Sequence, residues 1–147
     1  MSHTKWMRYA LEEARISEKK GEVPIGCVIV SNNKVISKSH NSTISNTDPT
    51  AHAEIQCIRQ AASIIQNHRI TDTSIYVTLE PCIMCYGAIT QARIPNVYFG
   101  AYDKRTGVFS QPNLSNLLSL NHHPKWEGGI LEKECSEILT HFFKTRR

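Results

Sequence analysis

Two short stretches organise this chain, Thr50-Ala51-His52-Ala53-Glu54 and Pro81-Cys82-Ile83-Met84-Cys85. They supply one imidazole, two thiols in a C-x-x-C spacing, and a carboxylate two residues beyond the imidazole. A catalytic zinc site uses three protein ligands and keeps a fourth position for water. The imidazole and the two thiols would fill three positions of a tetrahedron, and the carboxylate would remain to move protons. These residue types suit a catalytic metal site, but their spacing alone does not establish one.

Both stretches are expected at helix starts. His52 follows Asp48-Pro49-Thr50, which is typical of a loop leading into a helix. Pro81 suits the first turn of a helix because its missing N–H costs nothing there. Cys82 and Cys85 would then lie three residues apart in that first turn, with both sulfurs on one face. The positive end of the helix dipole lowers a thiol pKa, which favours the thiolates that a metal needs.

The same residues allow other interpretations. A C-x-x-C pair also occurs in redox motifs and in structural zinc sites. A redox motif would leave His52 and Glu54 without a role, and a structural zinc would need a fourth ligand, for which Cys57 lies too deep in its helix. Glu54 taken alone is compatible with an ordinary solvated helix carboxylate. The set taken together favours zinc held by His52, Cys82 and Cys85, with Glu54 as the proton shuttle.

The pattern around these stretches alternates helices and strands. It predicts an α/β fold, a three-layer α/β/α sandwich on a mixed five-stranded sheet with helices on both faces. A helix between the last two strands would make them parallel. The expected helices are one ending near Gly21, then Ala51–Ile65, Cys82–Gln91, a short one near Asn113–Leu120, and Glu132–Lys144. The expected strands are Ile25–Val30, Lys34–Ser39 after a turn at Asn32-Asn33, Ile75–Leu79, Asn96–Ala101 and Trp126–Ile130.

Composition places the chain among ordinary globular proteins. It has 147 residues, 40% of them hydrophobic and 20% charged, so we expect residues 1–147 to form a single domain. No apolar run approaches the ~20 residues that span a bilayer, and no signal-peptide core is seen, so no membrane partner and a cytoplasmic location are expected. The net charge of +4 permits a nucleic-acid partner without requiring one. Five cysteines suggest no disulfide framework, and buried reduced thiols are expected at Cys27, Cys57 and Cys135.

The H-x-E and P-C-x-x-C pair is the signature of zinc-dependent nucleobase deaminases. Segments flanking it resemble the bacterial tRNA-specific adenosine deaminase family within that superfamily, and the resemblance runs nearly end to end. The segments that carry it are Val23-Pro24-Ile25-Gly26, Asn41, Asp48 to Ile55, Tyr76 to Cys85, Phe99 to Gly107, Asn121-His122, Gly129-Ile130-Leu131 and Phe142 to Arg147.

The resemblance implies a homodimeric hydrolase with one Zn²⁺ per subunit that converts adenosine to inosine at the wobble position of a tRNA anticodon stem-loop. Glu54 would take a proton from a zinc-activated water, which attacks C6 of adenine, and would pass protons to the ring nitrogen and the departing ammonia. Asn41 matches the position that holds the flipped nucleoside. Matches to RNA-contacting positions are Asp103, Lys104, Arg105, Thr106, Asn121, His122, Phe143, Arg146 and Arg147.

Each matched position also has an interpretation without RNA. Asn41 could cap a turn, Lys104 and Arg105 could be solvated loop charges, and one of Phe142 and Phe143 should belong to the core. The alternative function is deamination of a free base or nucleoside, guanine or cytidine. From another class, a zinc-stabilised RNA-binding module would have no use for Glu54.

Overall fold

The computed structural model describes residues 2–146, which form one mixed sheet with strand order β2-β1-β3-β4-β5. The strands are β1 (Gly26–Ser31), β2 (Lys34–His40), β3 (Ser74–Leu79), β4 (Asn96–Ala101) and β5 (Lys125–Glu127). The β1–β2 and β1–β3 pairs are antiparallel, whereas the β3–β4 and β4–β5 pairs are parallel. The expected mixed sheet and the expected parallel final strand pair are confirmed.

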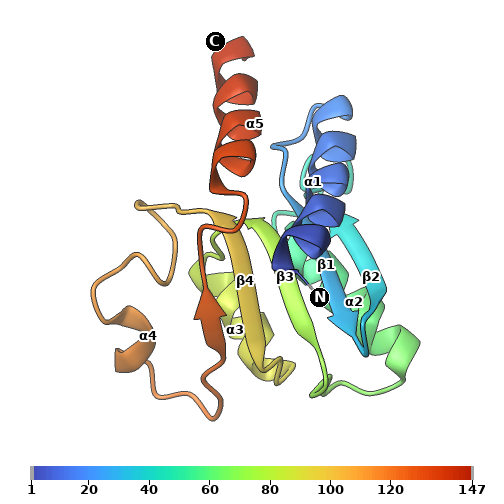
Figure 1. The fold of residues 1–147 in the computed structure, drawn as a ribbon, viewed down its shortest axis with the longest axis vertical. Coiled ribbons are helices and arrows are strands. Elements are labelled where there is room, and N and C mark those ends of the chain that lie inside the picture. The colour runs from blue at the N-terminus through green and yellow to red at the C-terminus, as the bar shows by residue number, and fades with distance from the viewer. Residues whose placement is uncertain (1, 147) are drawn as a thin grey trace.

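Helices cover both faces of this sheet (Figure 1). They are α1 (His3–Lys19), α2 (Ala53–Ile65), α3 (Ile83–Gln91), α4 (Leu114–Leu117) and α5 (Glu132–Thr145). Figure 1 shows α1 in front of the sheet and α2 and α3 behind it, while α5 rises above the upper edge of the sheet; its residues share the front core with α1. The predicted three-layer α/β/α sandwich is therefore confirmed. None of the helices within residues 2–146 is long and apolar enough to cross a membrane.

Two apolar cores hold the layers together. Behind the sheet, Cys27, Ile29 and Val77 pack with residues of α2 and α3 such as Cys57 and Ile89. In front of it, residues of α1 and α5 pack on the other face of the same strands, and this core includes Met7, Leu11, Val28, Tyr76 and Cys135. Cys27, Cys57 and Cys135 are buried and free of disulfides, as expected.

One close contact fixes the distance between α1 and the sheet. A Cβ built on Gly26, at the start of β1, would lie 1.9 Å from the carbonyl oxygen of Ala10 and 2.5 Å from the backbone nitrogen of Ala14. Only glycine leaves room for this approach of helix backbone to strand. The β1–β2 hairpin follows from its turn residues, since Asn32 and Asn33 both adopt positive φ angles, 50° and 63°.

Several element boundaries differ from expectation, most of them by one or two residues. The α2 and α3 helices begin at Ala53 and Ile83, because His52 and Cys82 keep extended backbone angles as N-caps. The final strand covers Lys125–Glu127 rather than 126–130, because Gly128 follows and Gly129 turns the chain with a φ of 87°. The short helix near residues 113–120 is confined to α4.

Candidate metal centre

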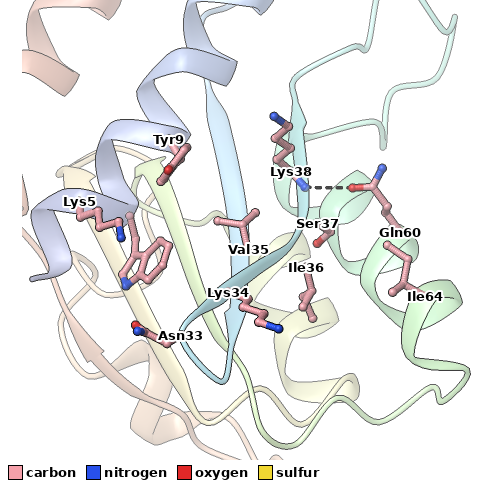
Figure 2. A pocket seen from close by; sticks show the side chains of 11 residues that line it. Lys5, Tyr9, Asn33, Lys34, Val35, Ile36, Ser37, Lys38, Gln60 and Ile64 are labelled. Atoms are coloured by element: carbon pink, nitrogen blue, oxygen red, sulfur yellow. Dashed lines mark hydrogen bonds between the residues drawn. The ribbon is translucent and has the colours of Figure 1, made fainter. Parts of the chain in front are cut away.

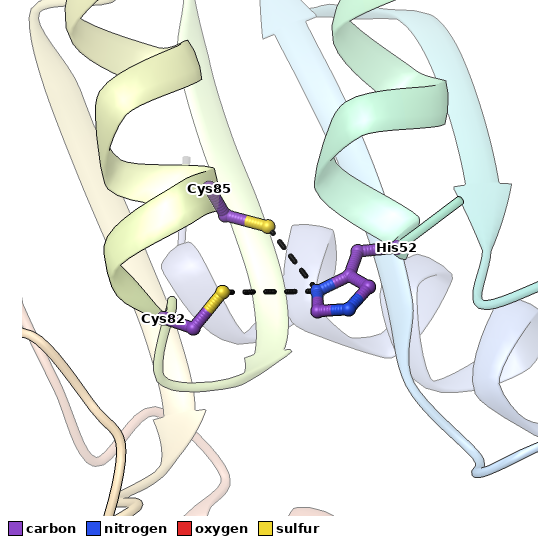
Figure 3. A group of neighbouring side chains, drawn as sticks. All are labelled: His52, Cys82 and Cys85. Atoms are coloured by element: carbon purple, nitrogen blue, oxygen red, sulfur yellow. Dashed lines mark hydrogen bonds between the residues drawn. The ribbon is translucent and has the colours of Figure 1, made fainter. Parts of the chain in front are cut away.

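The three predicted ligands come together between the starts of α2 and α3, beside the carboxyl end of β3 (Figure 3). The Nδ1 atom of His52 lies 3.7 Å from Sγ of Cys82 and 3.5 Å from Sγ of Cys85. One donor atom from each residue falls within 4.8 Å of the others. The imidazole and both thiols therefore face one common point, although they lie 30 and 33 residues apart in sequence.

Local backbone geometry aims these side chains. Upstream of His52, the Asp48 carboxylate accepts hydrogen bonds from the backbone N–H and the hydroxyl of Thr50, which fixes the turn into α2. The carbonyl of Cys82 accepts the first helical bond of α3, from the N–H of Tyr86. Cys82 is thus the N-cap of α3 rather than a member of its first turn, and Cys85 lies within that turn. Both sulfurs nevertheless point toward His52 (Figure 3).

The donor set fits a tetrahedral zinc ion. Ordinary Zn–S and Zn–N bond lengths at a tetrahedral angle require an N···S separation of about 3.6 Å. The two separations from His52, 3.7 and 3.5 Å, agree with that value. Two thiols and one imidazole are also a ligand set that suits zinc.

The electrostatics of the cluster favour a thiolate. A hydrogen bond from the Cys85 thiol, reinforced by one from His52, lowers the pKa of Cys82 to about 4. The same bond raises the pKa of Cys85, because Cys85 is then the proton donor. The hydrogen bond to Cys82 also raises the pKa of His52 against the effect of burial. A thiolate stabilised in this way is prepared for a cation.

Glu54 lies in the first turn of α2 and is only 4% exposed. Burial, together with the negative charge of Cys82, raises the pKa of Glu54 to about 7, although its backbone N–H and His52 act in the opposite direction. A carboxyl group with a pKa near neutrality can both take and release protons. The alternative of a solvated helix carboxylate does not fit this burial.

A small pocket opens at the cluster, with a volume of about 190 Å³. Its walls include His52, Glu54 and Cys82, and around them Ile25, Leu79, Glu80, Asp103 and Thr106. Two of the predicted RNA-contacting residues, Asp103 and Thr106, therefore belong to the pocket itself. Sequence patterns give no role to Ile25, Leu79 and Glu80, which the fold brings to the pocket wall.

A wider groove of about 600 Å³ adjoins this pocket and shares Leu79, Asp103 and Thr106 with it. Lys104, Arg105 and Phe143 also line it, so the structure brings these predicted residues together beside the cluster. Phe143 is 51% exposed, whereas Phe142 is buried, as expected for one of the pair. Arg146 stacks over Phe142, with its guanidinium carbon 4.7 Å from the ring centroid. Arg147 lies outside the described residues.

The remaining predicted residues take other positions. Asn41 is buried, and its backbone N–H donates to the carbonyl of Ile25, a residue of the pocket wall. Asn121 and His122 lie at the opposite end of the sheet, where the His122 ring bonds to the carbonyl of Ile94, just before β4. One protomer therefore does not bring Asn121 and His122 to the pocket.

A second groove lies on another part of the surface, between α1, β2 and α2 (Figure 2). Its volume is about 690 Å³, and Lys5, Lys34 and Lys38 line it together with apolar and neutral side chains. Among the described residues that line it, none is His, Cys, Asp or Glu. The chemistry described above therefore belongs to the smaller pocket.

The mixed sheet, the two helix starts and the His-Cys-Cys cluster with its buried glutamate define a deaminase with a cytidine deaminase-like fold. The family model for MafB19-like deaminases matches residues 1–147. A tRNA-specific adenosine deaminase of Buchnera aphidicola subsp. Baizongia pistaciae is 46% identical over 143 residues, which cover 97% of this chain and 88% of that protein. The chain belongs to the tRNA-specific adenosine deaminase family of MafB19-like deaminases.

Solved structures give the same picture. A tRNA:A34 deaminase, which performs A-to-I editing at the wobble position of transfer RNA, superposes with a TM-score of 0.89 and 41% identity, covering 93% of this chain and 100% of that one. The guanine deaminase of Bacillus subtilis superposes with a TM-score of 0.66 and 35% identity, covering 69% of this chain and 66% of that one.

Proposed function

We propose that this protein hydrolyses the exocyclic C–N bond of adenosine at the wobble position of a tRNA anticodon, giving inosine and ammonia. The observation that carries the proposal is the convergence of His52, Cys82 and Cys85 beside buried Glu54, at the base of a pocket that opens onto a basic and aromatic groove. The relatives named tRNA-specific adenosine deaminase support the choice of substrate. Such an enzyme would act in the cytoplasm, where tRNA is found.

We assign zinc to the cluster, one ion per subunit, with His52, Cys82 and Cys85 as its ligands. When bound there, zinc would supply a water activated for attack near neutral pH. The protein contributes the remaining proton transfers. Glu54 takes one proton from the attacking water and delivers it to the adenine ring nitrogen, and then passes a second to the leaving amine, which departs as ammonia. Water, adenosine, inosine and ammonia balance without any further reactant.

The groove beside the pocket suits an RNA loop. Lys104 and Arg105 are exposed there and can contact phosphates, while Phe143 presents a ring on which a base can stack. Asp103 and Thr106 line the pocket where the extruded adenosine would lie, and Asn41 packs behind its Ile25 wall. Asn121 and His122 would have to act from a second subunit, because they lie far from the pocket of their own protomer.

The outer face of α3 suits the expected homodimer. Its sequence is apolar nearly throughout, and only Cys85, Tyr86, Ile89 and Thr90 are buried. Ile83 is 52% exposed, and a Cβ on Gly87 would meet nothing within 4 Å. A helix that is apolar on both faces is usually covered on both. Gly87→Arg, which fits the isolated protomer, should shift the sedimentation of the protein to the monomer, whereas Glu12→Arg on α1 should not.

The alternative substrate is a free base or nucleoside. Likeness to the Bacillus subtilis guanine deaminase favours guanine as the competing substrate. The parallel β4–β5 pair does not fit the hairpin expected for a small free-cytidine enzyme.

Ammonia release decides between these substrates. It should be measured in parallel on a stem-loop with wobble adenosine, the same stem-loop with cytidine, free adenosine, free cytidine and guanine. We expect fast ammonia release from the adenosine stem-loop alone. In Glu54→Gln the turnover rate of this stem-loop should fall by about 10²–10⁴-fold, while the zinc content is retained. Faster turnover of guanine or cytidine would reject the substrate, and full turnover by Glu54→Gln would remove this residue from the chemistry.

A further inference from the structure

Glu80 is a buried carboxylate with no role in the chemistry described above. It follows β3, directly before Pro81 and Cys82, and is only 3% exposed. Charged side chains are rarely buried to this extent unless partners compensate them. The partners of Glu80 show what it does.

Within residues 2–146, the hydrogen bonds to the Glu80 carboxylate all come from one segment, residues 103–110, here called the 103–110 loop. The Oε1 atom of Glu80 accepts hydrogen bonds from the backbone N–H of Asp103 at 2.8 Å and from the hydroxyl of Ser110 at 2.5 Å. Its Oε2 accepts from the backbone N–H of Ser110 at 2.6 Å. One carboxylate thus binds both ends of the loop.

The loop packs directly on this carboxylate. A Cβ built on Gly107 would lie 2.2 Å from the carboxyl carbon of Glu80. The N–H of Val108 donates to the carbonyl of Pro81 at 2.9 Å, which fastens the loop to the residue between Glu80 and Cys82. On the outer side, the neutral Gln111 amide bridges the loop carbonyls, at 3.2 to 3.3 Å. Glu80 is therefore the charged anchor beneath the loop.

The 103–110 loop, held in this way, supplies residues to both the pocket and the groove beside it. Asp103 and Thr106 face the pocket, and Lys104 and Arg105 line the groove beside it. Residues 103–110, all of them described, include no helix or strand. Turn bonds to Asp103 from Arg105, Thr106 and Gly107 shape the loop internally, and the Glu80 contacts attach it to the end of β3. Anything that loosens the Glu80 contacts would move the residues that face the substrate, while His52, Cys82 and Cys85 are held by α2 and α3.

We propose that Glu80 is a positioning residue that holds the 103–110 loop in the conformation that binds RNA, and so sets substrate affinity rather than the rate of the bond-breaking step. The inference rests on the proposed function, because it takes the groove to be an RNA site. Glu80 is part of the pocket wall, but both of its carboxylate oxygens are engaged by Asp103 and Ser110, so it acts through the loop.

Glu80→Gln tests the proposal because it keeps the shape and replaces one acceptor by an NH₂ group. In the orientation that keeps the Oε1 bonds, that group would face the N–H of Ser110, donor against donor. We expect KM for the stem-loop to rise about tenfold, with kcat changed by less than about threefold and zinc content unchanged. Ser110→Ala, which removes one of the three donors, should give a smaller rise in KM. If Glu80→Gln folds poorly, Ser110→Ala still tests whether these hydrogen bonds set KM.

The direction of the change in KM distinguishes a positioning role of Glu80 from a general effect of its negative charge. Loss of a negative charge alone would strengthen binding to RNA. Glu12→Gln, at an exposed position of α1, removes the same charge and should leave KM unchanged or slightly lower. A fall in kcat at constant KM, or a loss of zinc, in Glu80→Gln would overturn the proposal.

Amide hydrogen exchange gives a readout that does not depend on turnover. In Glu80→Gln the N–H groups of Asp103 and Ser110 should exchange faster, while amides within α2 and α3 remain protected. Unchanged protection of residues 103–110 would overturn the proposal. If the native protein failed to convert the stem-loop, the proposed function would fail, and hydrogen exchange would still decide whether Glu80 holds the loop.

Discussion

Each of the three proposed ligands is fixed by its own backbone setting, and none depends on a long flexible side chain. His52 and Cys82 are the N-cap residues of α2 and α3, and Cys85 lies in the first turn of α3. The metal would therefore join the starts of two helices that also pack together in the core behind the sheet. Ligand loss should reduce stability as well as metal content, since binding free energy is part of folding free energy in such sites.

Replacing His52 by Ala should lower zinc content from about one ion per chain to a small fraction, as measured by metal analysis of purified protein. Cys57→Ala provides a matched control, because Cys57 is a buried cysteine of α2 whose sulfur contacts the Ser37 hydroxyl instead of the cluster. It should keep its zinc. Full occupancy in the His52 variant would reject the ligand set.

Glu22 holds the segment that precedes His52 in the way Glu80 holds the 103–110 loop. It is fully buried and accepts hydrogen bonds from the N–H groups of Ile44 and Ser45 and from the Ser45 hydroxyl. Burial alone would raise the pKa of Glu22, but these bonds together outweigh it and hold the pKa below its ordinary value. The ionised form is therefore bound more tightly in the folded protein than in the unfolded chain.

This lowered pKa predicts a pH dependence of stability. The contribution of Glu22 should be fully present above its unfolded pKa of about 4.3 and should be lost as the pH falls through the lower folded value. The free energy of unfolding of Glu22→Gln should thus be lower than that of the native protein at pH 7, and the gap should narrow below about pH 4. Denaturant titrations across this range measure it, and a gap independent of pH would contradict the assignment.

At the scale of elements, the sequence predicts a helix, strand or turn wherever a few neighbouring residues determine it. The Asn32-Asn33 turn, the amphipathic helices and the loop before His52 each carry their signal within a few residues, and the sequence predicts each of them. It does not predict the role of Glu80, because the donors to this carboxylate lie 23 and 30 residues further along the chain. The positions of Asn121 and His122 are also beyond its reach, since the contact with Ile94 depends on the path of the chain after β4.

Gly26 tests the packing of α1 on the sheet. Gly26→Ala places a methyl group against the backbone of α1, at Ala10 and Ala14, where no side chain can rotate away. We expect a loss of unfolding free energy of ~1–3 kcal/mol or more from overpacking. Gly100→Ala is a comparison of another kind, because its nearest atom is the side-chain sulfur of Cys135. That sulfur can shift, and the nearest backbone atom, the Thr78 carbonyl oxygen, is 2.9 Å away instead of 1.9 Å, so Gly26→Ala should be the more damaging of the two in thermal unfolding.

For the molecule as a whole, two separate grooves each carry basic side chains. Lys104 and Arg105 lie beside the pocket, whereas Lys34 and Lys38 lie in the groove of Figure 2, between α1, β2 and α2. The overall charge of +4 does not distinguish them. Under the proposed function, the first pair would lie next to an adenosine bound in the pocket, and the second pair would not.

The salt dependence of binding should therefore separate these lysines and arginines. Removing one phosphate-binding side chain should reduce the slope of log K against log salt by about 0.7–0.9. The double variant Lys104→Ala/Arg105→Ala should weaken stem-loop binding and lower the slope by roughly 1.5, as measured by fluorescence anisotropy between about 50 and 300 mM salt. Lys34→Ala/Lys38→Ala removes the same number of positive charges at a distance from the pocket, so its slope should match that of the native protein. Equal slopes for the two double variants would show that the RNA does not follow the groove beside the metal cluster. A larger effect of Lys34 and Lys38 would place the nucleic acid on the α1–β2–α2 side instead.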